Sequence, residues 1–210
     1  MSEVPSSKTI QWNGLELPDR PRFLNGCAKS VSLVEAFEAR GWDAWTCDIL
    51  PSEGWHKHIQ DDVLKHLNDG WDMAIFHPDC TYFANSGVRW YHERQQQELT
   101  KRAAEFFNTL RNARIPLICL ENPIPHKYAK EYIGEYDQLI QPWNFGDMET
   151  KAICLWLKGL PRLAKEITTK PEGVKQSVWR EPPSPERKAN RSRNFPGVSR
   201  AMATQWGNRC

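Results

Sequence analysis

The chain has 210 residues, of which 40% are hydrophobic and 26% are charged, and its formal net charge is +2. This length and composition predict one globular domain with its own core and argue against a disordered chain. A membrane span needs roughly 20 consecutive apolar residues, but the apolar runs here are only strand-length, and no secretory signal opens the sequence. Six cysteines without CxxC pairing favour a reducing compartment. We therefore expect a cytoplasmic protein without membrane partners.

A polar lead-in over residues 1–20 precedes an alternation of apolar segments and turn residues. Strands are expected over residues 21–25, 43–49, 71–77, 116–121, 139–141 and 151–158. Helices are expected over residues 30–40, 62–67, 93–114 and 199–206. The alternation predicts an α/β domain over residues 21–160, with a Rossmann-like, mostly parallel sheet and helices on both faces. Residues 161–210 are expected to form a basic, Pro-rich extension that packs back with a short C-terminal helix.

Positive charge is concentrated near the C-terminus. Residues 168–200 contain eight Lys and Arg against three Glu, a local charge of +5 that leaves about −3 for the rest. Arg191 and Arg193 lie in the densest part of this segment. Such a segment suits contact with the phosphates of a nucleic acid, single-stranded nucleic acid included, but it also suits a solvated tail.

Polar residues follow four of the predicted strands, and ligands of open α/β sheets bind outside the carboxyl ends of the strands. The four strand ends are Asn25-Gly26, Asp48, His77-Pro78-Asp79-Cys80 and Glu121-Asn122. An acidic residue in the position of Asp48 commonly accepts hydrogen bonds from the ribose hydroxyls of an adenosine cofactor. The alternative for Asp48 is a surface turn before Leu50-Pro51.

Two of these strand ends carry groups suited to catalysis. Cys80 follows a proline at the edge of the expected cleft, where a thiolate could attack an electrophilic carbon, although a buried strand-end thiol is the alternative. Burial of Glu121 would raise the pKa of its carboxyl and allow it to donate a proton to a ring nitrogen. The alternative for Glu121 is a carboxylate bound to neighbouring loop amides.

This order of an acidic strand end, a strand–Pro–x–Cys turn and a strand–Glu–Asn turn resembles the cytosine-5 DNA methyltransferase family. In that family a Pro-Cys turn carries the nucleophile, and a Glu-Asn-Val turn carries the glutamate that holds the base. The resemblance implies that Cys80 is the nucleophile, that Glu121 binds and protonates N3 of cytosine, and that Asp48 holds the ribose of S-adenosylmethionine. It implies further cofactor contacts from Asn25, Gly26, Asp62 and His77. Substrate contacts are expected from Asp79, Thr81, Asn122, Lys151, Arg191 and Arg193.

A second and more specific resemblance covers about residues 22–207. Segments such as AFEARGWDAWTCDILP, HPDCTYFANSG and LENPIPHKYAKEYIG are similar to those of compact methyltransferase-like proteins of phages and prophages. This resemblance implies a class I methyltransferase-like fold, a role in DNA modification and a bacterial or phage-infected bacterial cell. The expected substrate is DNA or a cytosine nucleotide.

Two departures from the family pattern favour other functions. The glycine-rich cofactor loop is reduced to Gly26-Cys27-Ala28-Lys29-Ser30, which makes close approach of the backbone to a cofactor harder. Asp79 places negative charge beside the expected thiolate and disfavours it. One alternative is a methyltransferase-like binding protein without catalysis, with a nucleic acid or a host protein as partner. Another is a different base- or nucleotide-modifying enzyme that uses the same pocket.

A metal site is a further alternative, since zinc accepts imidazole and thiolate ligands. His56, His58, His77 and Cys80 could supply them, but their spacing matches no zinc signature. We therefore expect no metal.

Overall fold

The computed structural model describes residues 9–12, 15–180, 182, 184 and 194–208. Its centre is a seven-stranded sheet in the order β5-β4-β3-β6-β7-β9-β8. The strands are β3 (Arg22–Gly26), β4 (Asp43–Asp48), β5 (His58–Gln60), β6 (Met73–Phe76), β7 (Leu117–Asn122), β8 (Gln138–Ile140) and β9 (Ile153–Lys158). Neighbours from β5 to β7 pair in parallel, whereas β9 pairs antiparallel with both β7 and β8. The expected mostly parallel α/β fold is confirmed.

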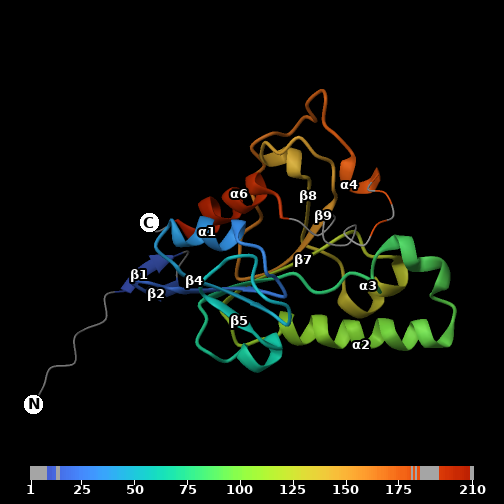
Figure 1. Ribbon diagram of the computed structural model, residues 1–210, viewed down its shortest axis with the longest axis horizontal. Helices are drawn as coiled ribbons and strands as arrows, with labels where there is room; N and C mark the ends of the chain where they lie inside the picture. Colours follow the sequence, from blue (N-terminus) through green and yellow to red (C-terminus); the bar gives the residue numbers. More distant parts are fainter. Residues whose placement is uncertain (1–8, 13–14, 181, 183, 185–193, 209–210) are drawn as a thin grey trace, which may run out of the picture.

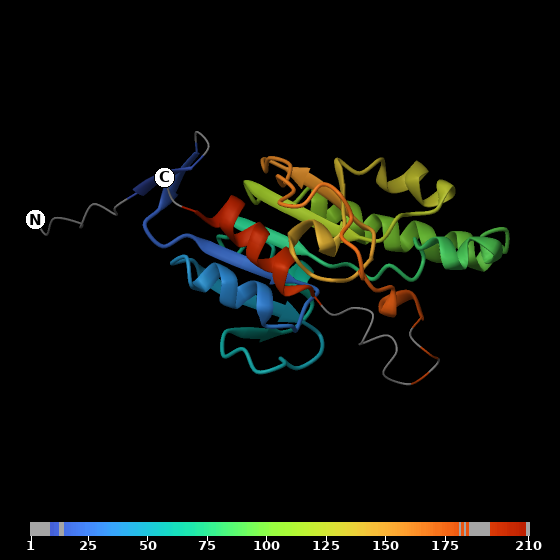
Figure 2. The ribbon, with the colours of Figure 1, turned by 90° about the horizontal axis from the view of Figure 1, so that it is seen from above.

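The central strands are buried on both faces, as their continuous apolar sequences predict. All four residues of β6 (MAIF) are buried, and so are the first four of β7 (LICL). Helices α1 (Ser32–Glu38) and α6 (Pro196–Gly207) cover one face together with the 3-10 helix η3 (Pro142–Phe145). The other face packs against η1 (Val63–His66), α2 (Arg94–Arg111) and α3 (Lys127–Ile133). Figures 1 and 2 show α1 and α6 side by side on the face opposite α2.

Local sequence signals explain the longest helix. Helix α2 buries Thr100, Ala104, Phe107 and Leu110, which recur every three or four residues and so form one stripe. The remaining faces of α2 are polar and largely exposed. Helix α6 differs, because residues all around it are buried between α1, η3 and the sheet.

Several elements were not expected from the sequence. Strands β1 (Thr9–Trp12) and β2 (Leu15–Pro18) form an antiparallel hairpin within the predicted lead-in, and Trp12 and Leu17 pack into the core. The Asn-Gly pair between these strands in the sequence is a strong hairpin signal that could have revealed them. Strand β5 and helix α3 were also missed, as were η2 (Asn85–Trp90) and α4 (Ser177–Arg180). Strand β5 is too short for an alternating pattern, and α3 follows two prolines.

The sheet order creates a crevice between β3 and β6. From β3 the chain builds outward through β4 and β5 on one side and then returns to add β6 and β7 on the other. At such a switch point the connections leave in opposite directions, and ligands bind beside the strand ends. Asn25 and Gly26 end β3 directly opposite the end of β6, so this crevice is the natural place for a site.

Candidate functional site

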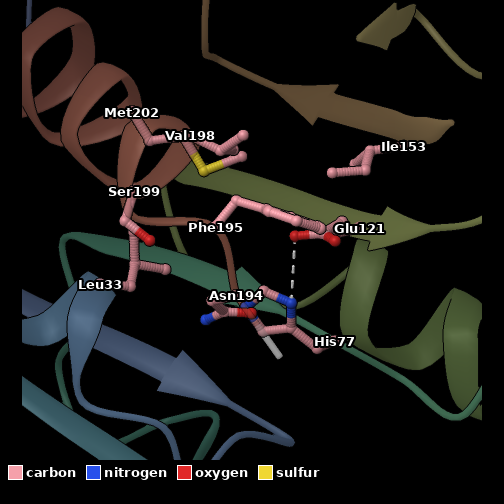
Figure 3. Close-up of a pocket in the computed structure, with 9 residues that line it drawn as sticks. All are labelled: Leu33, His77, Glu121, Ile153, Asn194, Phe195, Val198, Ser199 and Met202. Carbon is pink, nitrogen blue, oxygen red and sulfur yellow. Dashed lines mark ion pairs between the residues drawn. The ribbon is translucent and has the colours of Figure 1, made fainter. Parts of the chain in front are cut away.

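Three strand ends converge on His77. Its Nε2 lies 3.0 Å from Oδ1 of Asn25 at the end of β3, and its Nδ1 lies 3.3 Å from Oε2 of Glu121 in β7. Glu121 is opposite His77 because Phe76 pairs with Leu120, one residue earlier on each parallel strand. Figure 3 shows the imidazole facing Glu121, with a dashed line that marks the ion pair. An acceptor oxygen faces each ring nitrogen, and a doubly protonated ring satisfies both.

The charge state of Glu121 differs from the sequence-based expectation. Burial by itself would raise the pKa of this carboxyl, but the hydrogen bond and charge of His77 and the charge of Lys151 outweigh burial. The pKa of Glu121 therefore lies below its usual range. The expectation that the pKa of Glu121 is raised was wrong, because it took account of burial but not of the histidine across the crevice. The lowered pKa favours the ionised form of Glu121.

The loops that follow β6 and β7 are joined to one another. Asn122 Nδ2 donates to the carbonyl of Pro78 at 2.9 Å, and the backbone N–H of His126 donates to Phe83 at 2.8 Å. A backbone bridge between Ala84 and Pro125 continues this pairing. Cys80 lies on the first loop, two residues after Pro78, and is half-buried. The structure thus brings the loops of Cys80 and Glu121 together at one edge of the sheet.

Asp79 participates in the local turn of the Cys80 loop. Its Oδ1 accepts hydrogen bonds from both the backbone N–H and the hydroxyl of Thr81. This Asx turn shapes the loop. Asp79 and Thr81, both expected to contact substrate, therefore have a structural role in the chain as it stands.

The ends of β3 and β4 form a second part of the site. Cys27, directly after β3, has φ of 55°, a left-handed conformation that side chains other than glycine rarely adopt. Cys27 therefore makes a turn that usually requires glycine. Gly26 is required by packing, since a Cβ there would lie 2.5 Å from the Phe76 ring. Burial, followed by the charges of Asp48, Cys47 and Asp62, raises the pKa of the Cys27 thiol, which keeps it protonated.

Asp48 and Asp62 both lie near this turn and both cap a backbone amide. Asp48 Oδ1 accepts from the N–H of Leu50 at 2.9 Å, and Asp62 Oδ1 accepts from the N–H of Leu64 at 3.0 Å. The surface-turn role of Asp48 is therefore present in the structure. It does not exclude ribose binding, because the carboxylate has a second oxygen that makes no hydrogen bond within the described part of the chain.

Two buried amide atoms at the strand ends lack partners among the described residues. They are Nδ2 of Asn25, whose side chain is fully buried, and Oδ1 of Asn122, which is 3% exposed. A buried polar atom without a partner costs about 1–3 kcal/mol. Such atoms at the ends of β3 and β7, on either side of β6, fit a site whose ligand supplies the missing hydrogen bonds.

A small pocket opens beside His77 and Glu121, between the sheet and the start of α6. It has about 250 Å³ of free space, part of it open to solvent. Asn194 and Phe195 line it, as Figure 3 shows. Asn194 Nδ2 donates to Ser30 Oγ at 2.9 Å, and Lys151 Nζ lies 5.4 Å from the centre of the Phe195 ring. Neither Asn194 nor Phe195 was predicted as a pocket residue, because α6 is more than 70 residues away from His77 and Glu121 in sequence.

The candidate metal ligands do not come together. His58 contacts Thr46 Oγ1 and the carbonyl of Leu50, whereas His77 contacts Asn25 and Glu121. Among the residues that the structure describes, no group of three His, Cys, Asp or Glu side chains could hold a metal ion. Arg191 and Arg193 lie outside the described residues. None of the described helices is long and apolar enough to cross a membrane.

Comparisons with known proteins give distant likenesses only. No protein-family model and no curated protein matches the chain. One similar solved structure is a protein encoded within an E. coli prophage, with a provisional designation as a DNA modification methyltransferase. It is 14% identical with a TM-score of 0.40, over 65% of this chain and 46% of that one. Another is a methyltransferase of Entamoeba histolytica, 14% identical with a TM-score of 0.44, over 76% of this chain and 59% of that one.

The matched part is about half the length of these two structures. Similarity at this level identifies neither a substrate nor a reaction for this chain.

Proposed function

We propose that this chain is an S-adenosylmethionine-dependent methyltransferase that modifies C5 of cytosine in DNA or in a cytosine nucleotide. The observation that supports this most is the joining of the Cys80 and Glu121 loops through the Asn122–Pro78 hydrogen bond, beside the switch point of the sheet. A thiol and a carboxylate at adjacent strand ends are the two groups that addition to a cytosine ring requires.

The residues at the ends of β3 and β4 fit the cofactor. The orphaned Nδ2 of buried Asn25 offers a donor, and the left-handed turn at Cys27 lets the backbone approach a ligand closely. Asp48 would hold the ribose hydroxyls and Asp62 would lie near the adenine. When bound, S-adenosylmethionine supplies the methyl group and leaves as its thioether.

Cys80 makes the ring nucleophilic. Its thiolate adds to C6 of cytosine, so that a bond forms between Sγ and C6 while the electron pair of the C5–C6 double bond moves to C5. After C5 has accepted the methyl group, a base removes the C5 proton. The electrons of that C–H bond restore the double bond, and the Sγ–C6 bond breaks. The thiolate is thereby regenerated, and N3 returns the proton that it took up during the addition, so that atoms and charge balance.

Glu121 and His77 act as a pair on the other edge of the base. Ionised Glu121 accepts a hydrogen bond from the exocyclic amine of cytosine, and the proton that N3 takes up comes from the His77–Glu121 pair. Asn25 holds the far nitrogen of the imidazole and thereby orients His77 toward Glu121. Protonation of N3 draws electrons from C6 and assists the attack of Cys80.

A covalent trap tests the proposal. An oligonucleotide with 5-fluorocytosine is incubated with S-adenosylmethionine and the protein, and the peptide that contains Cys80 is then weighed by mass spectrometry. Fluorine at C5 cannot leave as a proton does, so the Sγ–C6 bond persists. We expect the adduct in wild type and in Cys119→Ser, whose thiol is fully buried in β7, and none in Cys80→Ser. An adduct that persists in Cys80→Ser would remove Cys80 from the mechanism.

The small pocket beside Phe195 favours one alternative, a methyltransferase-like binding protein without catalysis. Thermal unfolding with S-adenosylmethionine separates the two functions. A ligand at 100 times its dissociation constant stabilises the folded state by about 2.7 kcal/mol. No thermal shift and no adduct, with nucleic-acid binding retained, would support the binding protein.

A further inference from the structure

A cluster of aromatic rings lies at the outer end of the two joined loops. It forms where residues 89–92, at the end of η2 and just after it, meet residues 126–128, at the start of α3. The rings of Tyr91 and Tyr128 stack with their centroids 4.2 Å apart and their planes 7° apart. His92 contacts Tyr128 edge-on at 5.4 Å, and its Nε2 lies 3.3 Å from the Tyr128 hydroxyl.

Buried groups hold this cluster in place from below. Tyr91 is only 7% exposed, and its hydroxyl lies 3.4 Å from that of Tyr132. His126 packs beside Tyr91 at 5.4 Å, accepts from the N–H of Ala129 and donates to the carbonyl of Tyr82 at 3.0 Å. The inner rings thus have a structural role: they fasten η2 to α3.

The outer members of the cluster have no such role. Trp90 is 51% exposed, and the Arg89 guanidinium lies 4.9 Å from the centre of its ring. Lys127 Nζ lies 4.7 Å from the Tyr128 ring centre, and Arg89, His92 and Lys127 are all exposed. Trp90 therefore presents an aromatic ring to solvent in a setting of exposed cations.

We propose that Arg89, Trp90, His92, Lys127 and Tyr128 form a stacking platform for single-stranded nucleic acid. Flat rings bind the faces of bases whatever their sequence, and cations beside those rings contact the phosphates. This proposal deepens the proposed function, on whose substrate class it rests, and favours an unpaired strand over a duplex. Unpaired bases expose the faces that a stacking surface needs, whereas bases within a duplex do not.

The loops that follow β6 and β7 connect the platform to the candidate site. Trp90 is ten residues after Cys80, and Tyr128 is seven residues after Glu121. The hydrogen bonds from Asn122 to Pro78 and from His126 to Phe83 hold the intervening loops against each other. A strand whose bases stack on Trp90 would therefore lie beside the loops that also carry the candidate site.

Fluorescence anisotropy with a labelled single-stranded DNA of about 12 nucleotides tests the platform, since single-strand sites span about 4–16 nucleotides. We expect Trp90→Ala to raise the Kd roughly 5- to 150-fold, because a stacked base contributes about 1–3 kcal/mol. Trp90→Phe keeps a ring and should restore most of the affinity. The double variant Arg89→Ala/Lys127→Ala should reduce the slope of log K against log salt by about 0.7 per lost phosphate contact.

Matched controls are Met148→Ala, which removes an apolar side chain 48% exposed outside the platform, and Arg162→Ala, an exposed cation after β9. Neither should change the Kd by more than about twofold. The proposal is overturned if Trp90→Ala binds the single strand as tightly as wild type does, or if wild type binds no single strand. It is also overturned if Trp90→Ala weakens duplex binding as much as it weakens single-strand binding. The Cys80→Ser variant separates the platform from the proposed function. If Cys80→Ser binds the single strand like wild type but forms no adduct, binding by the platform does not depend on methyl transfer.

Discussion

At the scale of single residues, His77 decides the chemistry of the candidate site. It follows β6 directly, and its two contacts come from the strands on either side of β6. An isolated carboxyl in this crevice would favour its protonated form, whereas the carboxyl beside His77 favours its ionised form. The same residue therefore sets the charge of Glu121 and satisfies Oδ1 of buried Asn25.

Replacing His77 by Ala should reverse the charge preference of Glu121. Without the imidazole, burial opposes only the charge of Lys151, so the pKa of Glu121 should rise. Removing a partner from buried Asn25 should also lower the free energy of unfolding by about 1–3 kcal/mol. Titration of the ¹³C-labelled glutamate carboxyls by NMR follows the pKa, and urea unfolding follows the stability. An unchanged Glu121 pKa would show that His77 does not hold the charge.

The lowered pKa of Glu121 also predicts how stability depends on pH. A carboxyl whose pKa is lower in the folded than in the unfolded chain stabilises the fold above the unfolded pKa of about 4.5. This contribution is lost as the pH falls through the folded pKa. The free energy of unfolding of wild type should therefore decrease more steeply below pH 4.5 than that of Glu121→Gln. Parallel curves for the two proteins would contradict the prediction.

At the scale of elements, α6 is the part that closes the site. Asp147, after η3, accepts hydrogen bonds from the backbone N–H groups of Gly197 and Val198 in the first turn of α6. Gly197 permits this approach, since a Cβ there would lie 2.3 Å from the carbonyl of Phe145. Trp206 anchors the other end, fully buried with its Nε1 donating to Pro161. Both ends of α6 are thus fixed by residues distant in sequence.

Asp147→Ala should destabilise the protein by about 0.5–2 kcal/mol, because it leaves two amides at the helix N-terminus without their acceptor and removes a favourable charge there. Chemical denaturation measures this loss. Glu166→Ala is the matched control: it removes a carboxylate that pairs with Arg200 of the same helix, in an exposed pair worth about 0–1 kcal/mol. If Asp147→Ala and Glu166→Ala lower the free energy of unfolding by the same amount, capping of α6 by Asp147 stabilises the protein no more than an exposed ion pair does.

At the scale of the whole molecule, charge is divided between a domain of about −3 and the segment 168–200 of +5. Basic side chains hold phosphates without distinguishing bases. The segment would therefore bind the backbone of a nucleic acid while the aromatic platform binds bases. Its densest part, with Arg187, Arg191 and Arg193, lies outside the described residues, and its role stays a prediction.

Replacing Arg187, Arg191 and Arg193 together by Ala should weaken binding to all nucleic-acid sequences alike. The slope of log K against log salt should decrease by roughly 0.7 per lost contact for a single strand and 0.9 for a duplex. Anisotropy titrations across a series of salt concentrations measure both effects, with Lys101→Ala/Arg114→Ala, two exposed cations outside this segment, as the control. Unchanged affinity and slope in the triple variant would leave a mononucleotide or a protein as the better partner.

The sequence alone determined the fold class and the central strands. Short apolar runs such as those of β6 and β7 are typical of buried strands, and their alternation with α1 and α2 predicts a largely parallel sheet. Because parallel strands share a carboxyl edge, the sequence also predicted that Asp48, Cys80 and Glu121 would lie along one edge. These conclusions needed only local pattern and the general geometry of α/β sheets.

Tertiary structure alone decided the chemistry at that edge. The contact between His77 and Asn25 spans 52 residues, and that between Asn122 and Pro78 spans 44, so both depend on which strands are neighbours and in what register. The same holds for the ionised Glu121, for Phe195 at the pocket and for the stacking of Tyr91 on Tyr128. Local sequence cannot predict a pKa or a pocket, because both depend on the distances between side chains that only the folded chain brings together.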